Sequence, residues 1–188
     1  MDDYNGALGD FDRAIKLDSM YGNAYIYRAY AKRELKNYEG ALLDYDKAIA
    51  IDTSDKINYY NRGLTKNDLK DYKSAIIDFD RVIKLDAKYR KAYIQSAYAK
   101  YDLKDYQGAL IDYDRAIAID SSSNITYFNR GVTKKDLKDY KSAIIDFDRA
   151  IKLDSTYSNA YGGRGEAKYF MADYAGTVSF PIFKATLN

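Results

Sequence analysis

The side chains of this sequence that could do chemistry are carboxylates, amines and phenols, because its 188 residues include no histidine and no cysteine. Asp78 and Asp80 stand two residues apart, a spacing that a paired general acid and base could use. The same pair returns at Asp146 and Asp148, whereas a catalytic pair would occur once. Without histidine and cysteine, disulfides, thiolate nucleophiles and zinc sites of these residues are also excluded. We therefore expect no catalytic site, no metal site and no cofactor.

A second chemistry to consider is the stacking of nucleotide bases on tyrosines beside a basic stripe. Lysine pairs four residues apart recur along the chain, Lys66 and Lys70 among them. Acidic residues stand beside each pair, as Asp68 and Asp71 do here, and the formal net charge is only +2. Nucleic-acid binding needs a strong basic footprint. We therefore expect protein or peptide partners and no nucleic acid.

The elements that must position these residues are repeated helices. The stretch 72–86 returns almost unchanged at 140–154, and looser copies open at Tyr4, Tyr38 and Tyr106. The opening tyrosines lie 34 residues apart, and a fixed period of this size indicates a stacked repeat protein. Inside the stretch, apolar residues recur at the spacing of one helix face.

The period divides the chain 1–188 into a single predicted array of about 11 helices. Residues 1–21 match only a second helix, complete repeats span 22–55, 56–89, 90–123 and 124–157, and a degenerate repeat spans 158–188. Each repeat is numbered from position 1 to position 34. The chain thus starts in the middle of a repeat, and we favour a fragment of a longer protein over an unusual N-terminal cap.

Four positions of each repeat hold a fixed type of residue. Position 4 is Tyr25, Tyr59, Tyr93, Tyr127 and Tyr161, and position 8 is alanine or glycine; in the four complete repeats position 20 is alanine and position 24 is tyrosine or phenylalanine. Small residues at positions 8 and 20 let two helices approach closely, and the ring at position 24 fills the space beside them.

This pattern resembles the tetratricopeptide repeat over essentially the whole chain. The resemblance implies an all-α fold, a right-handed α–α superhelix (solenoid) of helix pairs. It also implies a protein-interaction scaffold without catalysis. Stability in such arrays adds from repeat to repeat, because one pair cannot bury both of its apolar faces.

Two departures from the family pattern are visible. Position 7, commonly leucine, is arginine in every repeat except the one that holds Ser96. A buried guanidinium needs a partner, and position 23 supplies aspartates, so we expect a structural arginine–aspartate ladder. Position 32, usually proline, holds serine, threonine or alanine, and we expect the hydroxyls to cap the following helix.

The sequence also has a longer period of 68 residues, which corresponds to two repeats. Repeats 56–89 and 124–157 share 26 of 34 residues, whereas the adjacent repeats 22–55 and 56–89 share 11. Position 34 alternates in the same way: it is Asp55 in the repeat 22–55 and Tyr89 in the next repeat. The surface chemistry should therefore alternate from repeat to repeat.

The resemblance places the ligand surface on the first helices, at positions 2, 5, 9, 12 and 13. Many of these residues are apolar or aromatic, and a solvated face would be polar. We expect a partner-binding groove at Ile26, Tyr30, Ile57, Tyr60, Leu64, Lys91, Ile94, Tyr98, Tyr101, Ile125, Phe128, Val132 and Tyr169. The alternative is that these side chains only pack between neighbouring first helices. The family's clamp for chaperone C-termini is not matched, because Gln95 stands where its last cation should be.

The two ends predict self-association. Ala7, Phe11 and Ala14 lack the first helix that would cover them, and Pro181 interrupts the last helix, which we expect to kink or stop near Phe180. Uncapped ends of repeat arrays expose apolar surface, so a homo-oligomer through the terminal helices is expected.

Neither membrane contact nor the cellular compartment is indicated by the sequence. No apolar run approaches the roughly 20 residues that span a bilayer, and the chain does not open with a signal peptide. We favour a cytoplasmic location and leave open a targeting sequence upstream of Met1. Two alternative functions also stay open: a targeting or regulatory segment of a larger protein, and a self-assembling structural array.

Overall fold

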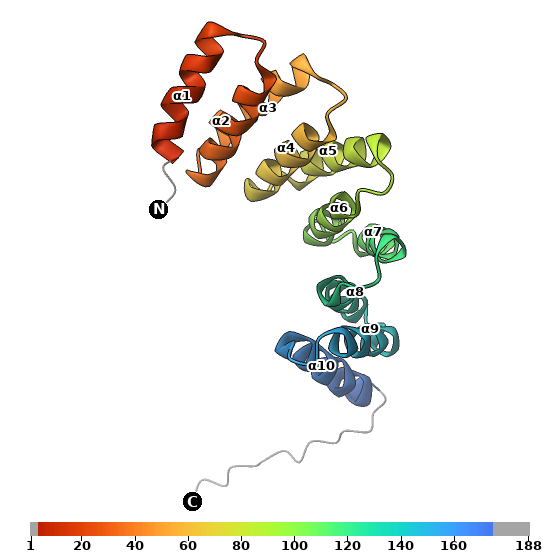
Figure 1. Ribbon diagram of the computed structural model, residues 1–188. Coiled ribbons are helices and arrows are strands. Elements are labelled where there is room, and N and C mark those ends of the chain that lie inside the picture. Colours follow the sequence, from red (N-terminus) through yellow and green to blue (C-terminus); the bar gives the residue numbers. More distant parts are fainter. Residues whose placement is uncertain (1–3, 175–188) are drawn as a thin grey trace, which may run out of the picture. The chain divides into compact units, whose positions relative to one another are not determined.

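In the computed structural model, residues 4–174 are described, and within this range the chain forms ten α-helices and no strand (Figure 1). The helices are α1 (Tyr4–Leu17), α2 (Gly22–Glu34), α3 (Tyr38–Ile51), α4 (Lys56–Asp68), α5 (Tyr72–Leu85), α6 (Arg90–Asp102), α7 (Tyr106–Ile119), α8 (Asn124–Asp136), α9 (Tyr140–Leu153) and α10 (Ser158–Tyr174). They form two compact units. The N-terminal unit, which ends at Asp120, holds α1 to α7, and the C-terminal unit, which begins at Ser121, holds α8 to α10. The expected all-α fold of helix pairs is confirmed.

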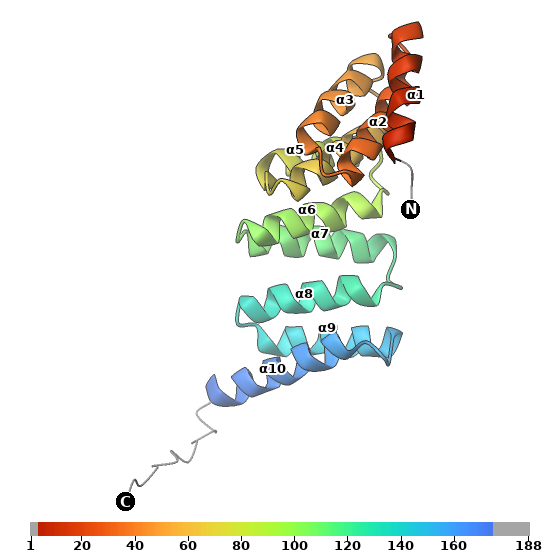
Figure 2. The ribbon, with the colours of Figure 1, turned by 90° about the vertical axis from the view of Figure 1, so that its left-hand side faces the viewer.

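Each repeat closes its helix pair with the same short turn. Lys36, Lys70, Lys104 and Lys138 adopt positive φ angles of 60° to 66°, the left-handed conformation that often ends a helix. The next residue begins the second helix as its N-cap. The side chain of Asp71, for example, accepts a hydrogen bond from the backbone N–H of Ser74. The antiparallel helices α6 and α7 follow from this turn and lie side by side (Figure 2).

The core of each repeat is a ring packed against a small residue. Phe79 on α5 is fully buried, and a Cβ added to Gly63 on α4 would lie 2.7 Å from its ring. Phe147 meets Gly131 in the same way at 2.9 Å. Even the Cβ of an alanine would press against the ring in these two repeats, which explains why glycine stands at position 8 opposite phenylalanine.

The predicted capping by position 32 is wrong, because the N-caps of the first helices lie two residues later. Asp55 caps α4 by accepting from the N–H of Ile57, and Ser123 caps α8 by accepting from Thr126. At Tyr21 and Tyr89 the cap residue makes no side-chain hydrogen bond. The alternation at position 34 is thus an alternation of capped and uncapped first helices.

Some of the expectations fall outside the described range. The eleventh helix and its interruption at Pro181 lie among residues 175–188, which the structure does not describe. The apolar residues Phe180, Ile182 and Phe183 belong to the same segment.

Candidate functional site

A groove of about 450 Å³ lies between the first helices α2 and α4 of the N-terminal unit. Its apolar wall is unusually open for tyrosine and isoleucine, with Tyr27 59%, Tyr30 45% and Ile57 39% exposed. The full lining is Asn23, Ile26, Tyr27, Tyr30, Asp55, Ile57 and Asn61. The groove therefore combines rigid aromatic surface with two amides and one carboxylate.

The residue at position 34 differs between the two neighbouring first-helix spaces of the N-terminal unit. Asp55 is short and turns back to cap α4, so the groove between α2 and α4 remains. One repeat later Tyr89 occupies the same position, and its ring packs edge-on against Tyr60 at 5.2 Å between centroids. Burial raises the pKa of the Tyr60 hydroxyl to about 12. Within the N-terminal unit, position 34 thus holds a capping carboxylate beside the α2–α4 groove and a packed ring one repeat later.

The C-terminal unit has a related groove of about 420 Å³ between α8 and α10. Phe128 packs on Phe147 and Tyr157, so its ring belongs partly to the core. Gly162 and Gly163 of α10 line this groove; a Cβ on Gly162 would meet no described atom within 4 Å, whereas a Cβ on Gly163 would lie 2.7 Å from the Phe147 ring. An ion pair of 2.5 Å between Lys135 and Glu166 borders this groove.

The thirteen predicted groove residues divide into two sets by exposure, and none of them is fully buried. The exposed set is Tyr30, Ile57, Lys91, Ile125 and Tyr169. The half-buried set is Ile26, Tyr60, Leu64, Ile94, Tyr98, Tyr101, Phe128 and Val132. Several of the second set pack on the core, as Tyr98 does on Tyr113 and Tyr101 on Tyr106. Packing between helices therefore accounts for much of the half-buried set.

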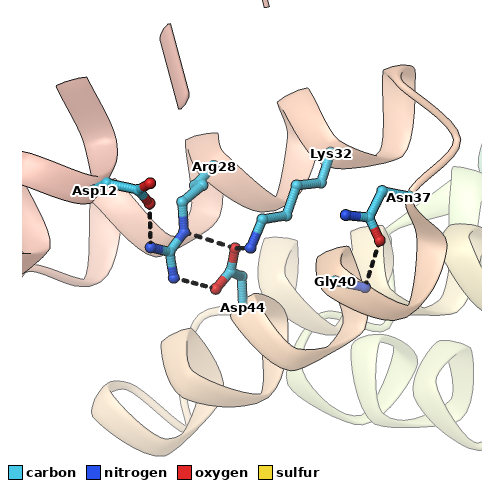
Figure 3. A network of polar contacts seen from close by, with 6 residues as sticks. All are labelled: Asp12, Arg28, Lys32, Asn37, Gly40 and Asp44. Carbon is cyan, nitrogen blue, oxygen red and sulfur yellow. Dashed lines mark hydrogen bonds and ion pairs between the residues drawn. The ribbon is translucent and has the colours of Figure 1, made fainter. Parts of the chain in front are cut away.

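Beneath these surfaces runs the predicted ladder of arginines and aspartates, and it is confirmed (Figure 3). Arg28 donates from Nε and Nη2 to the two carboxylate oxygens of Asp44, at 2.8 and 2.5 Å. Its Nη1 reaches Asp12 of the preceding repeat at 2.6 Å, and Lys32 adds a bond of 2.7 Å to Asp44. The hydrogen bonds that the Arg28 guanidinium donates to Asp44 raise the pKa of the guanidinium, so its charge is permanent.

The ladder recurs with little change in geometry. Arg62 holds Asp78 at 2.9 and 2.5 Å, and Arg130 holds Asp146 at the same two distances. Each aspartate is almost fully buried, and a lysine one turn after the arginine joins it. These carboxylates are therefore committed to structure, which supports the expectation that they do no catalysis.

One rung of the ladder is incomplete. Ser96 replaces arginine in the repeat 90–123, so the buried Asp112 is held by Lys100 alone at 2.6 Å within the described range. Asp80 stands where Asp12 and its equivalents meet an arginine, and desolvation raises the pKa of its carboxyl. The Ser96 hydroxyl is buried and makes no hydrogen bond to any described residue.

Four residues of the α2–α4 groove were missed by the sequence reasoning: Asn23, Tyr27, Asp55 and Asn61. Tyr27 and Asn61 both occupy position 6, which is not among the positions 2, 5, 9, 12 and 13 that the resemblance places on the ligand surface. A second feature was also missed. An exposed apolar row recurs at position 22 of the second helices, at Leu43, Ile77, Ile111 and Ile145, each between 61% and 68% exposed.

Two other kinds of feature are absent from residues 4–174. In that range no cluster of three acidic side chains could hold a metal ion. No helix of the same range is long and apolar enough to cross a membrane.

Comparisons with known proteins agree with the repeat pattern. Family models described as tetratricopeptide repeat match residues 1–56, 58–89, 91–123 and 126–157. No curated protein matches the sequence.

Solved structures share the fold at low sequence identity. A structure of MamA superposes with a TM-score of 0.79 at 18% identity, covering 83% of this chain and 91% of that one. YrrB, described as a TPR protein with an unusual peptide-binding site, gives 0.74 at 21% identity over 89% and 84%. A tetratricopeptide repeat protein from Parabacteroides merdae gives 0.81 at 17% over 93% and 70%.

Proposed function

Since the chain belongs to the tetratricopeptide repeat family, we propose that it is a non-enzymatic interaction scaffold whose α2–α4 groove binds an extended peptide segment of a partner protein. Members of this family are generally scaffolds for protein contacts. YrrB, which shares the fold, is described as having a peptide-binding site, and this likeness supports the proposal.

The observation that carries the proposal is the exposure of apolar rings around polar groups in this groove. Tyr27, Tyr30 and Ile57 each keep more than a third of their surface exposed, although Tyr27 also stacks on Phe11 and Tyr30 meets Tyr4 edge-on. Aromatic side chains of this kind anchor partners well, because they lose little conformational entropy on binding. Asn23 and Asn61 supply amides that pair with the backbone of an extended peptide.

The chemistry of the groove specifies the peptide in outline. The apolar wall selects side chains such as leucine or phenylalanine as anchors. Asp55 contributes the carboxylate of the lining, and it selects a basic residue next to those anchors. We thus expect a short segment with two apolar residues beside one lysine or arginine.

Absence of catalysis is part of the proposal. The candidate acid–base residues Asp78 and Asp146 are each bound by an arginine and a lysine. A carboxylate held by two cations is committed to the ladder and is not free to contact a substrate.

The test selects peptides on the intact chain and measures where they bind. A display library of random peptides is selected, and the dissociation constant of an enriched peptide is measured by fluorescence anisotropy. The variant Tyr30→Ala/Ile57→Ala should weaken binding at least about tenfold, the loss of roughly 1.4 kcal/mol that one anchor supplies.

A matched control removes equal apolar surface elsewhere. Leu43→Ala/Ile77→Ala truncates two exposed side chains of the second helices in the same unit, and it should leave the dissociation constant unchanged. If the control weakens binding and the groove variant does not, the peptide site lies on the second helices and the proposal is wrong.

A further inference from the structure

A complete rung of the ladder holds one guanidinium between two carboxylates and against an aromatic ring. Arg28 lies between Asp44 of its own repeat and Asp12 of the preceding one (Figure 3). Its guanidinium carbon also lies over the Tyr25 ring, 5.4 Å from the centroid. The rung of Arg62 has the same arrangement, with 5.6 Å to its ring. Each complete rung is therefore a binding site for a guanidinium, built from two carboxylates and one aromatic face.

The repeat 90–123 has the two carboxylates of such a site without an arginine of its own. Lys100 donates to Oδ2 of Asp112, which is 6% exposed, and within residues 4–174 no donor reaches its Oδ1. Asp80 of the preceding repeat is exposed and forms no ion pair with any described residue. Desolvation raises the pKa of the Asp80 carboxyl, Lys100 lowers it, and the charge of Asp112 raises it further. The two carboxylates therefore act on each other.

Two further side chains mark the same place as a site. Ser96 stands at the arginine position and is fully buried, and its Oγ has no hydrogen-bond partner among the residues that the structure describes. Tyr93 at position 4 is half-buried, whereas Tyr25 and Tyr59 are 9% exposed beneath their arginines. No cation of the described residues lies over the Tyr93 ring. A buried hydroxyl without a partner and an uncovered ring both favour a donor that comes from outside the chain.

We propose that Asp80, Asp112 and Tyr93 form a binding site for the guanidinium group of an arginine side chain from a partner protein. The guanidinium donates to both carboxylates and covers the Tyr93 ring, as Arg62 does in its own rung. Its planar fork suits this site better than a second ammonium, because it makes two parallel bonds to one carboxylate.

The position of the site agrees with an arginine that enters from solvent. Asp80 is exposed, so this edge of the site is open. The complete rungs show that the same set of groups accepts the end of an arginine side chain. The site shares no residue with the α2–α4 groove, so the inference does not rest on the proposed function.

The test titrates the full, isotopically labelled chain with Nα-acetyl-arginine amide and follows its backbone amide signals by nuclear magnetic resonance. Saturable shifts are expected at Ser96 and Asp112. Nα-acetyl-lysine amide has the same charge without the fork, and its dissociation constant should be at least about tenfold higher. The citrulline analogue has nearly the same shape without the charge, and it should give no saturable shift.

Three variants locate the bound probe. Asp80→Asn removes one exposed carboxylate and should raise the dissociation constant at least about tenfold, the effect of one charged hydrogen bond. Ser96→Arg supplies a guanidinium from within the chain and should abolish the shift at Asp112. Asp46→Asn makes the first change at the equivalent position of the preceding repeat, where Arg62 is already in place, and should leave the dissociation constant unaltered. Circular dichroism checks that each variant keeps the fold, and Asp80→Asn decides the test if Ser96→Arg does not.

Several results would overturn the proposal. They are the absence of saturable shifts, equal binding of the lysine probe, and binding that persists in Asp80→Asn. An equal loss in Asp46→Asn would also overturn it, because the effect would then come from overall charge. Agmatine, which carries the same guanidinium without peptide groups, distinguishes the sources of the ligand. Weaker binding of agmatine than of the arginine probe supports an arginine side chain, whereas tighter binding would assign the site to a small guanidine and contradict a protein partner.

Discussion

Replacing Arg62 by methionine tests the energetic role of the ladder. The variant keeps the apolar volume of the side chain but removes both hydrogen bonds to Asp78, which is 1% exposed. Removing one partner of a fully buried ion pair costs about 3–5 kcal/mol. Lys66 stays at 2.8 Å from the same carboxylate. We therefore expect a smaller loss in the free energy of unfolding, about 2–4 kcal/mol, of which the exposed bridge to Asp46 supplies at most about 1 kcal/mol.

Thermal unfolding followed by circular dichroism measures this loss. For a chain of this size each kcal/mol corresponds to roughly 2–4 °C in Tm, so the midpoint should fall by roughly 4–16 °C. The double variant Arg62→Met/Asp78→Leu should recover at least half of the loss, because it leaves no unpaired charge. The dissociation constant of a selected peptide should not change in either variant.

Two results would refute this reasoning. A loss below about 0.5 kcal/mol would place Arg62 among ordinary surface ion pairs. A double variant as unstable as the single one would mean that the methionine damages packing, and that the charge of Asp78 is not the cause.

Three further predictions address single side chains. Tyr45→Phe should raise the free energy of unfolding by about 1 kcal/mol in a denaturant titration, because the buried Tyr45 hydroxyl has no hydrogen-bond partner in the described range; a destabilised variant would contradict this. Ser96→Arg should raise Tm by supplying the missing guanidinium to Asp112 and Asp80, and an unchanged or lower Tm would mean that the site cannot admit an arginine. Burial raises the pKa of Tyr60 from 10.0 to about 12, so its stabilising contribution is complete below pH 10 and is lost as the pH rises toward 12. Urea titrations should therefore show a steeper alkaline loss of stability for the wild type than for Tyr60→Phe, and equal slopes would contradict this assignment.

The fold was predictable from the sequence because its signals repeat. Tyrosine at position 4, a small residue at position 8 and a ring at position 24 recur in each of the four complete repeats, so each of these repeats supports the assignment of the others. The partners of Arg62 and Arg130 could also be named in advance, since a buried guanidinium requires a carboxylate and position 23 offers a regular supply.

The open groove was less predictable, because its existence depends on what fills the space between helices. Tyr60 and Ile26 occupy the same position of neighbouring repeats, yet Tyr60 is packed by Tyr89 while Ile26 lines an opening next to Asp55. The alternation at position 34 was visible in the sequence. Its effect on packing was not, because it depends on Asp55 turning back to cap α4.

The most direct test of the peptide-binding groove places a photo-crosslinking amino acid at single positions. Benzoylphenylalanine is introduced at Tyr30 in the groove or at Ile77 on the second-helix row, which is exposed but lies outside the groove. A labelled peptide from the display selection is added and irradiated, and the crosslinked product is quantified on a gel. Crosslinking from position 30 and none from position 77 is the predicted result. Crosslinking from position 77 alone would contradict the assignment of the groove as the binding site.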